Sequence, residues 1–146
     1  MLNIRRIEPK DKELFLEMTE KFYSSDAVMH PIPEKYRADT FDEIISESPF
    51  ADAFILELDE KPAGYALFSF TYSQEAGGKV VWIEELYVRE SFRGMGVGKA
   101  VFSFAEKTFG AKRIRLEVEP ENKRAAQLYE RLGYSVLPYN QMYKEL

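Results

Sequence analysis

A chain of 146 residues, 45% hydrophobic and 31% charged, has the size and composition of one globular domain, so we expect a single domain over residues 1–146. The absence of cysteine excludes thiolate chemistry and thiolate metal sites, and a net charge of −5 provides no broad basic surface for nucleic acid. No run of 18 apolar residues is present, so the expectation is a soluble, cytoplasmic protein that binds no metal, no membrane and no nucleic acid.

The first part of the chain predicts one short strand and two helices. The strand covers residues 4–7, and a helix over residues 11–23 places apolar side chains on one face. A polar connection containing prolines follows, and a weaker helical pattern lies near residues 40–47. The apolar face of the first helix, formed by Leu14, Phe15, Met18 and Phe22, should belong to the core.

The middle of the chain predicts a β-meander. Three runs rich in β-branched and aromatic residues are separated by turn sequences and cover residues 53–58, 63–72 and 80–88. Short connections between such runs favour antiparallel neighbours.

The last part alternates helix and strand. The expected elements are a helix over 97–109, a strand over 113–118, a helix over 122–132 and a strand over 142–146. Gly133 is the expected C-terminal cap of the last helix. Strands followed by alternating helices and strands predict an α+β, or mixed α/β, domain in which helices cover one sheet.

Charge is unevenly distributed along the chain. Residues 1–60 contain 7 Lys and Arg against 15 Asp and Glu, a net charge of −8. Residues 61–146 contain 13 Lys and Arg against 10 Asp and Glu, a net charge of +3. This asymmetry favours a cationic ligand near the first part and an anionic ligand near the second, although solvated faces alone also produce such patterns.

The single histidine, His30, precedes Pro31 in the polar connection. A Ser-His-Asp arrangement would depend on this loop residue alone, so we interpret His30 as a residue of the surface or of a pocket rim.

Glycines at positions 94, 96 and 98 lie where a predicted strand leads into a predicted helix. Residues without side chains let an anion approach the backbone, and the first helical N–H groups are free to donate to it. The alternative is a glycine-rich helix entry without a ligand.

Two nucleotide motifs do not fit this junction. A Gly-x-x-x-x-Gly-Lys-Ser/Thr loop would need glycine at Arg93 and a hydroxyl residue at Ala100. A Gly-x-Gly-x-x-Gly dinucleotide motif would need glycine at Lys99. The spacing therefore disfavours an ATP-dependent kinase and a dinucleotide-dependent oxidoreductase.

The arrangement Arg-x-x-Gly-x-Gly, formed by Arg93, Gly96 and Gly98, resembles the pyrophosphate-binding signature of the GNAT superfamily of N-acetyltransferases. The preceding strand sequence Ile-Glu-Glu-Leu-Tyr-Val over residues 83–88 resembles the strand of that family. A later segment resembles its strand-helix-turn, with matching residues Glu119, Pro120, Glu121, Asn122, Ala125, Leu128, Tyr129, Leu132, Gly133 and Tyr134. The resemblance is strongest over residues 53–146.

The resemblance implies a central mixed, mostly antiparallel sheet of about six or seven strands flanked by about four helices. It implies acetyl-CoA as the acyl-donor cosubstrate, bound where two parallel strands separate. The implied cosubstrate contacts are Leu86, Tyr87, Val88, Arg93, Gly94, Met95, Gly96, Val97, Gly98, Lys99, Asn122 and Tyr129. Three of these have alternatives: Lys99 as a solvated residue, Asn122 as a helix N-cap and Tyr129 as a core residue.

The catalytic residues implied by the resemblance are Glu84 as the base and Tyr129 as the donor to the thiolate. Amine attack needs a free base, whereas alkylammonium groups have pKa values of about 10.4. Period-2 alternation predicts that Glu84 and Glu85 lie on opposite faces, with Glu84 sharing its face with Trp82, Leu86 and Val88. Glu85 is the reserve candidate, and either carboxylate is alternatively a solvated rim residue or an ion-pair partner.

The acceptor site is expected to involve Glu84, Glu85, Asp26 and Tyr36, with Glu34 as a further candidate in the variable region 23–36. The acidic first part favours a small cationic amine, namely a diamine, polyamine or basic amino acid. The alternatives are a protein or peptide amine and a CoA-binding regulatory module without turnover. Because dimers are frequent among similar proteins, a homodimer is the expected assembly if the chain associates.

Overall fold

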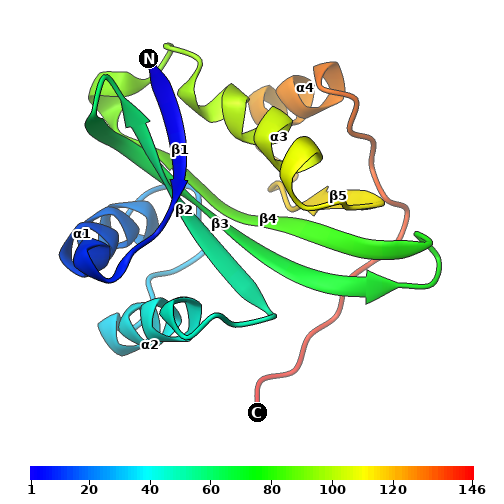
Figure 1. Ribbon diagram of the computed structural model, residues 1–146. Helices are drawn as coiled ribbons and strands as arrows, with labels where there is room; N and C mark the ends of the chain where they lie inside the picture. Colours follow the sequence, from blue (N-terminus) through cyan, green and yellow to red (C-terminus); the bar gives the residue numbers. More distant parts are fainter. The chain divides into compact units, whose positions relative to one another are not determined.

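The computed structural model describes residues 1–146 and contains two compact units, Met1–Leu116 and Glu117–Leu146. The first unit contains one five-stranded sheet in the order β1-β2-β3-β4-β5 (Figure 1). The strands are β1 (Leu2–Arg6), β2 (Ala51–Leu58), β3 (Lys61–Ser73), β4 (Gly78–Val88) and β5 (Arg113–Leu116). All neighbours are antiparallel except β4 and β5, which are parallel. The mixed, mostly antiparallel α+β fold is therefore confirmed, with five strands instead of six or seven.

The helices of the first unit cover both faces of this sheet (Figure 1). On one face lie α1 (Lys12–Tyr23), preceded by the 3-10 helix η1 (Pro9–Asp11), and α2 (Glu34–Ile45). On the other face lies α3 (Val97–Thr108), which follows the 3-10 helix η2 (Glu90–Phe92) and connects β4 to β5. The second unit contains α4 (Lys123–Arg131). None of these helices combines the length and the apolar character needed to cross a membrane.

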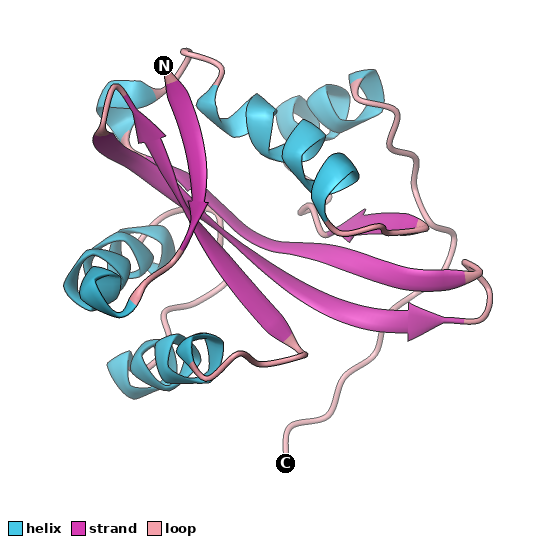
Figure 2. Cartoon of the chain, viewed as in Figure 1, coloured by secondary structure: helices cyan, strands magenta, loops and turns pink.

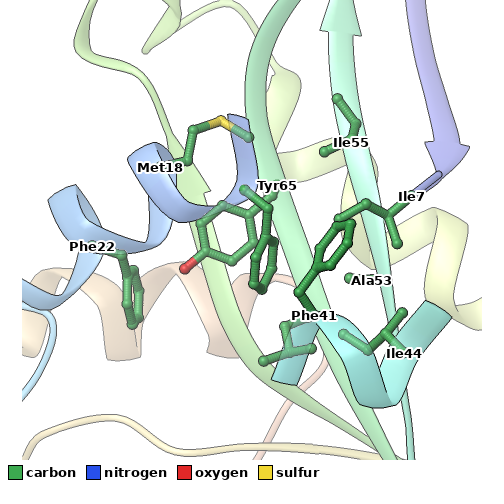
Figure 3. Packing of buried hydrophobic residues seen from close by; sticks show 10 residues of the cluster. Ile7, Met18, Phe22, Phe41, Ile44, Ala53, Ile55 and Tyr65 are labelled. Atoms are coloured by element: carbon green, nitrogen blue, oxygen red, sulfur yellow. The ribbon is translucent and has the colours of Figure 1, made fainter. Parts of the chain in front are cut away.

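The core between the sheet and α1/α2 combines aliphatic and aromatic side chains (Figure 3). Phe15, Phe22 and Phe41 pack around Tyr65 of β3, whose ring is fully buried. Figure 3 shows the Tyr65 hydroxyl oxygen on the side of Phe22 of α1. A buried phenol needs a hydrogen-bond partner, so the position of this hydroxyl identifies a polar group within an apolar face.

The opposite face contains a second aromatic cluster beneath α3. The rings of Phe54 and Phe68 from the sheet contact Phe104 and Phe109, with centroid separations of 4.8 to 6.4 Å. Tilted and edge-on pairs at such distances stabilise a core beyond their buried area. This cluster fixes α3, and therefore its N-terminus, against the sheet.

Two expectations from the sequence are wrong. Helix α2 begins at Glu34 instead of near residue 40, because its first turns are good helix formers with few apolar residues to reveal the period. Residues 142–146 form no strand, and the chain after α4 is drawn as loop to the C-terminus (Figure 2). Strand-like composition forms a strand only where a neighbour supplies ladder hydrogen bonds.

Candidate functional site

Strand β4 has a ladder partner on both sides only in its first half. Its parallel pairing with β5 runs from Val80 opposite Arg113 to Ile83 opposite Leu116 and then stops. On the β3 side, pairing continues to Val88 opposite Gly64. The β5 side of residues 84–88 therefore has backbone N–H and C=O groups without a ladder partner, which are available to an extended ligand.

A β-bulge interrupts the alternation of β4 at the two candidate carboxylates. Leu67 pairs with Glu85 whereas Phe68 pairs with Ile83, so Glu84 is the additional residue. Tyr65 and Ser69, which share a face of β3, donate to Glu85 and Glu84 respectively, at 2.7 and 2.6 Å.

Both carboxylates consequently lie on the α1/α2 face, and the prediction that they lie on opposite faces is wrong. The bulge also separates Glu84 from two residues predicted to share its face. A Cβ placed on Gly98 of α3 would lie 3.6 Å from Val88 Cγ2 and 4.0 Å from Leu86 Cδ2, so these two side chains point to the α3 face.

Glu85 lies among phenol donors. The Tyr23 hydroxyl donates to its Oε2 at 2.5 Å, and the Tyr65 hydroxyl donates to its Oε1 at 2.7 Å. Burial raises the pKa of Glu85, and the two phenols oppose this rise by stabilising the carboxylate. The pKa of each phenol is itself raised, mainly by burial, so both remain protonated donors at neutral pH.

Glu84 lies in a different environment. Its side chain is exposed, and one oxygen accepts from the Ser69 hydroxyl. Two adjacent carboxylates on one face thus differ in solvation, and such differences are how proteins assign different roles to identical groups.

The glycine junction forms the N-terminus of α3. Gly94 and Gly96 have φ values of 79° and 82°, a left-handed conformation that residues with side chains rarely adopt, and Gly96 is the N-cap. No side chain caps this end, and the Ala100 N–H donates to Gly96 O at 3.1 Å. The N–H groups of the three preceding residues are therefore directed out of the helix end, as anion binding requires.

The other predicted residues of this loop have different surroundings. Arg93 is exposed and its Nε donates to Val88 O at 3.1 Å, which ties the loop to the end of β4. Met95 and Lys99 are exposed, whereas the Val97 side chain is buried in the core, so Val97 offers only its backbone.

An open groove of about 860 Å³ runs beside the free end of β4. Its walls come from the end of α1 with the following loop and from the segment after the bulge; the lining residues are Lys21, Phe22, Ser25, Ala27, Leu86, Tyr87, Val88, Arg89, Glu90, Ser91 and Arg93. The groove joins four of the predicted cosubstrate contacts, Leu86, Tyr87, Val88 and Arg93. Sequence motifs gave no signal for the wall from α1, because its residues are 59 or more positions away in the chain.

An ion pair fixes that wall to β4. The Arg89 guanidinium makes two hydrogen bonds to the Glu17 carboxylate, at 2.7 and 3.2 Å. The fork geometry restrains both side chains and therefore the separation of α1 from the end of β4. Neither residue was singled out from the sequence.

Of the predicted acceptor region 23–36, Tyr23 is the residue that reaches a carboxylate of the site. The predicted candidates Asp26, Glu34 and Tyr36 are exposed. His30 is also exposed, with its Nδ1 3.2 Å from the carbonyl oxygen of the adjacent Pro31.

The second unit holds the remaining predicted residues. Asn122 caps α4: its Oδ1 accepts from Ala125 N at 3.2 Å, which is the alternative role considered from the sequence. Burial raises the pKa of Tyr129, whose ring lies 6.2 Å from that of Tyr134. A phenol that stays protonated has the property required of a proton donor. The positive φ of Gly133, 94°, matches its predicted place after the helix end.

Comparison with known proteins gives consistent matches. The profile of the Acetyltransferase (GNAT) family matches residues 13–134. A thialysine N-epsilon-acetyltransferase from Bos taurus is 35% identical over 111 residues, which cover 68% of this chain and 62% of the bovine protein. The Mus musculus protein of the same name is 31% identical over 144 residues, which cover 89% of this chain and 82% of the mouse protein. The chain thus spans about three fifths of the bovine relative and most of the mouse relative.

A solved structure gives the same fold. Aminoglycoside N-acetyltransferase AAC(6')-Iy, in complex with the bisubstrate analogue CoA-S-monomethyl-acetylneamine, aligns with a TM-score of 0.81 at 20% identity. The alignment covers 100% of this chain and 99% of that chain.

Proposed function

The chain belongs to the GNAT acetyltransferase family, and we propose from this that it transfers an acetyl group from acetyl-CoA to a small cationic primary amine. One observation carries the proposal. Strand β4 loses its partner after Ile83, and its free half leads through Arg93 into the uncapped N-terminus of α3. An extended arm and a diphosphate of one ligand fit these two adjoining features.

The residues present suit acetyl-CoA, which supplies an acyl thioester when bound. The N–H and C=O groups of Leu86 and the N–H of Val88 lie on the free edge of β4 and would hold the pantetheine arm. The backbone groups of Tyr87 face β3 and are paired with Tyr65. The amides that follow Gly96 would hold the diphosphate, since the positive end of the helix dipole favours an anion there. The strand-edge N–H groups are also the donors for the oxyanion that forms as the amine attacks.

Glu84 is the proposed proton acceptor. Its carboxylate is exposed, so a bound amine or an intervening water can reach it, and the Ser69 hydroxyl restrains one oxygen. The amine nitrogen attacks the thioester carbonyl carbon, Glu84 receives the proton from nitrogen, and the C–S bond then breaks. Tyr129 is the proposed donor to the departing thiolate, in line with its raised pKa. Direct attack of this kind gives sequential kinetics without an acylated enzyme.

The acceptor class follows from the charge of the site. Glu84 and Glu85 on one face give this side of the sheet a negative potential that attracts ammonium groups and repels carboxylates. The names of the bovine and mouse relatives, thialysine N-epsilon-acetyltransferase, and the acetylneamine analogue of the structural relative point in the same direction. Diamines, polyamines and basic amino acids are therefore the first acceptors to test.

The decisive experiment measures thiol release from acetyl-CoA with a panel of amines, beside calorimetric titrations with acetyl-CoA, NAD and ATP. We expect acetyl-CoA to bind and cationic primary amines to support turnover. Binding of NAD or ATP without binding of acetyl-CoA would overturn the proposal. Acetyl-CoA binding without turnover of any amine, small or peptidic, would favour a CoA-binding regulatory module instead.

The variant Glu84→Gln tests the base. We expect its rate to fall by about 10²- to 10⁴-fold near neutral pH and to recover partly at higher pH, where more amine is unprotonated. Glu106→Gln, which removes an exposed carboxylate from α3, is the matched control. A Glu84→Gln rate equal to that of the control at every pH would remove Glu84 from this role.

A further inference from the structure

The geometry points to Tyr23 and Tyr65 as positioning residues that hold Glu85 as a fixed carboxylate beside Glu84, so that Glu85 binds the acceptor cation while Glu84 takes the proton. The roles of the two carboxylates toward an amine rest on the proposed function, whereas the positioning of Glu85 by the two tyrosines does not. The triad of Tyr23, Glu85 and Tyr65 joins three elements, because these residues come from α1, β4 and β3.

Each oxygen of Glu85 has its own donor. Tyr23 donates to Oε2 at 2.5 Å and Tyr65 donates to Oε1 at 2.7 Å. A carboxylate accepts both hydrogen bonds. In a carboxylic acid one oxygen carries a proton, so it would face the phenol as a donor instead of as an acceptor. The two phenols therefore select the ionised form and restrict rotation of the carboxyl group.

Burial acts in the opposite direction. Desolvation raises the pKa of Glu85, and the neighbouring negative charge of Glu84 raises it further. Without its phenol donors, a partly buried glutamate next to another carboxylate would lose its proton only at higher pH. The donors oppose this rise in pKa and so favour the negative form of Glu85, the form that attracts an ammonium.

The groups facing the triad are few. Glu84 lies next to Glu85 on β4, Tyr23 comes from α1, and Tyr65 comes from β3. Arg37 of α2 is buried; its positive charge lowers the pKa of both phenols and partly compensates the negative charge of the site. Its guanidinium is held by Leu16 O at 2.6 Å and by the Thr19 hydroxyl at 3.2 Å.

The bulge places two carboxylates with different surroundings on one face. Glu85 is partly buried and bonded at both oxygens, so it is poorly placed to swing toward a proton but well placed to present a stationary charge. Glu84 is exposed with a single hydroxyl partner and can exchange its proton with solvent. The environments separate binding from proton transfer.

The test titrates Glu85 directly. Carboxyl ¹³C NMR of the free protein gives the titration midpoint of Glu85 in wild type, Tyr23→Phe and Tyr65→Phe, and the Glu85→Gln variant assigns the signal. Each phenylalanine keeps the ring and removes one donor, so we expect each midpoint to rise by about one pH unit. Tyr72→Phe, which alters an exposed tyrosine of the same strand β3, is the matched control and should leave the midpoint unchanged.

A Glu85 midpoint that is the same in both variants as in Tyr72→Phe overturns the inference. Tyr65 is fully buried, so thermal unfolding accompanies the titration; if Tyr65→Phe does not fold, Tyr23→Phe decides the question alone. The titration needs no substrate, so its outcome is separate from that of the amine screen.

Kinetics provide the second readout. In Glu85→Gln, the KM for a cationic amine should rise at least tenfold, with a smaller change in kcat and unchanged acetyl-CoA affinity by calorimetry. In the two phenylalanine variants, the pH below which KM rises should move upward with the Glu85 midpoint. A kcat loss in Glu85→Gln at constant KM would assign Glu85 to proton transfer and overturn the division of roles.

Discussion

Replacing Gly64 with alanine should disturb the free end of β4 more than any other single methyl addition at a glycine of the chain. A Cβ on Gly64 would lie 2.0 Å from Tyr87 O and 3.1 Å from Val88 Cα, and distances under 3.0 Å are essentially never observed. Because both obstacles are backbone atoms in paired strands, β3 and β4 must separate locally by roughly 1 Å to relieve the overlap.

The cost follows from this overlap. Overpacking of a closely packed region typically destabilises a protein by about 1–3 kcal/mol. A backbone atom cannot move aside by changing rotamer, so we expect Gly64→Ala to cost about 3 kcal/mol, the upper end of this range. For a chain of this length, the midpoint of thermal unfolding should fall by about 10 °C. Displacement of Val88 should also weaken acetyl-CoA binding, because its backbone N–H is a proposed contact of the pantetheine arm.

Circular dichroism melting and calorimetry with acetyl-CoA measure the two effects. Gly98→Ala is the stability control, since its Cβ would make ordinary contacts at 3.6 and 4.0 Å and its φ is not in the left-handed region. Alanine is also the better helix former, so Gly98→Ala should melt at the wild-type temperature or slightly above it. A Gly64→Ala midpoint within about 2 °C of wild type would refute the steric reasoning.

Two further changes test the capping loop and the N-terminal ion pair. Gly96→Ala should destabilise the fold by about 1 kcal/mol because of the φ of 82° at this position, although the added Cβ meets nothing within 4 Å. It should also reduce acetyl-CoA affinity in calorimetry. Unchanged affinity would show that ligand binding does not depend on this backbone conformation. Asp11→Asn should lower the urea-derived stability by about 2 kcal/mol at pH 7, because buried Asp11 accepts two hydrogen bonds from Arg5 and one from Glu8 N. The pKa of Asp11 is lowered by Arg5, so this stability is present above the ordinary carboxyl pKa and is lost as pH falls below about 4. The two proteins should therefore converge in stability toward pH 3, and a constant difference from pH 7 to pH 3 would contradict the assignment.

For most of the chain, the bounds of the elements predicted from hydrophobic periodicity agree with the structure within a few residues. Helix α1 and the three strands of the meander were expected at 11–23, 53–58, 63–72 and 80–88 and lie at Lys12–Tyr23, Ala51–Leu58, Lys61–Ser73 and Gly78–Val88. Helix α2 was recognised only in its second half, where Phe41 and Ile44 mark the buried side. Its first turns interact through Arg37, a residue type that hydropathy places at the surface.

The acceptor face could not be read from alternation. A strict period of two assumes one residue on β4 for each residue on β3, and the bulge breaks that count at Glu84. The same count placed Glu84 with Leu86 and Val88, which lie on the α3 face. A bulge depends on how two strands pair, so the sequence of either strand alone does not predict it.

By itself the sequence determined the local features: an α+β order of elements, an amphipathic α1, and glycines placed where a strand enters a helix. These depend on neighbours a few residues apart, which period and backbone freedom report directly. Only the tertiary structure decided that Tyr23 and Tyr65 meet at Glu85, that Arg89 pairs with Glu17, and that two adjacent carboxylates share a face. The first two features join residues 20 to 72 positions apart, and they arise because strand pairing and helix packing bring distant side chains together.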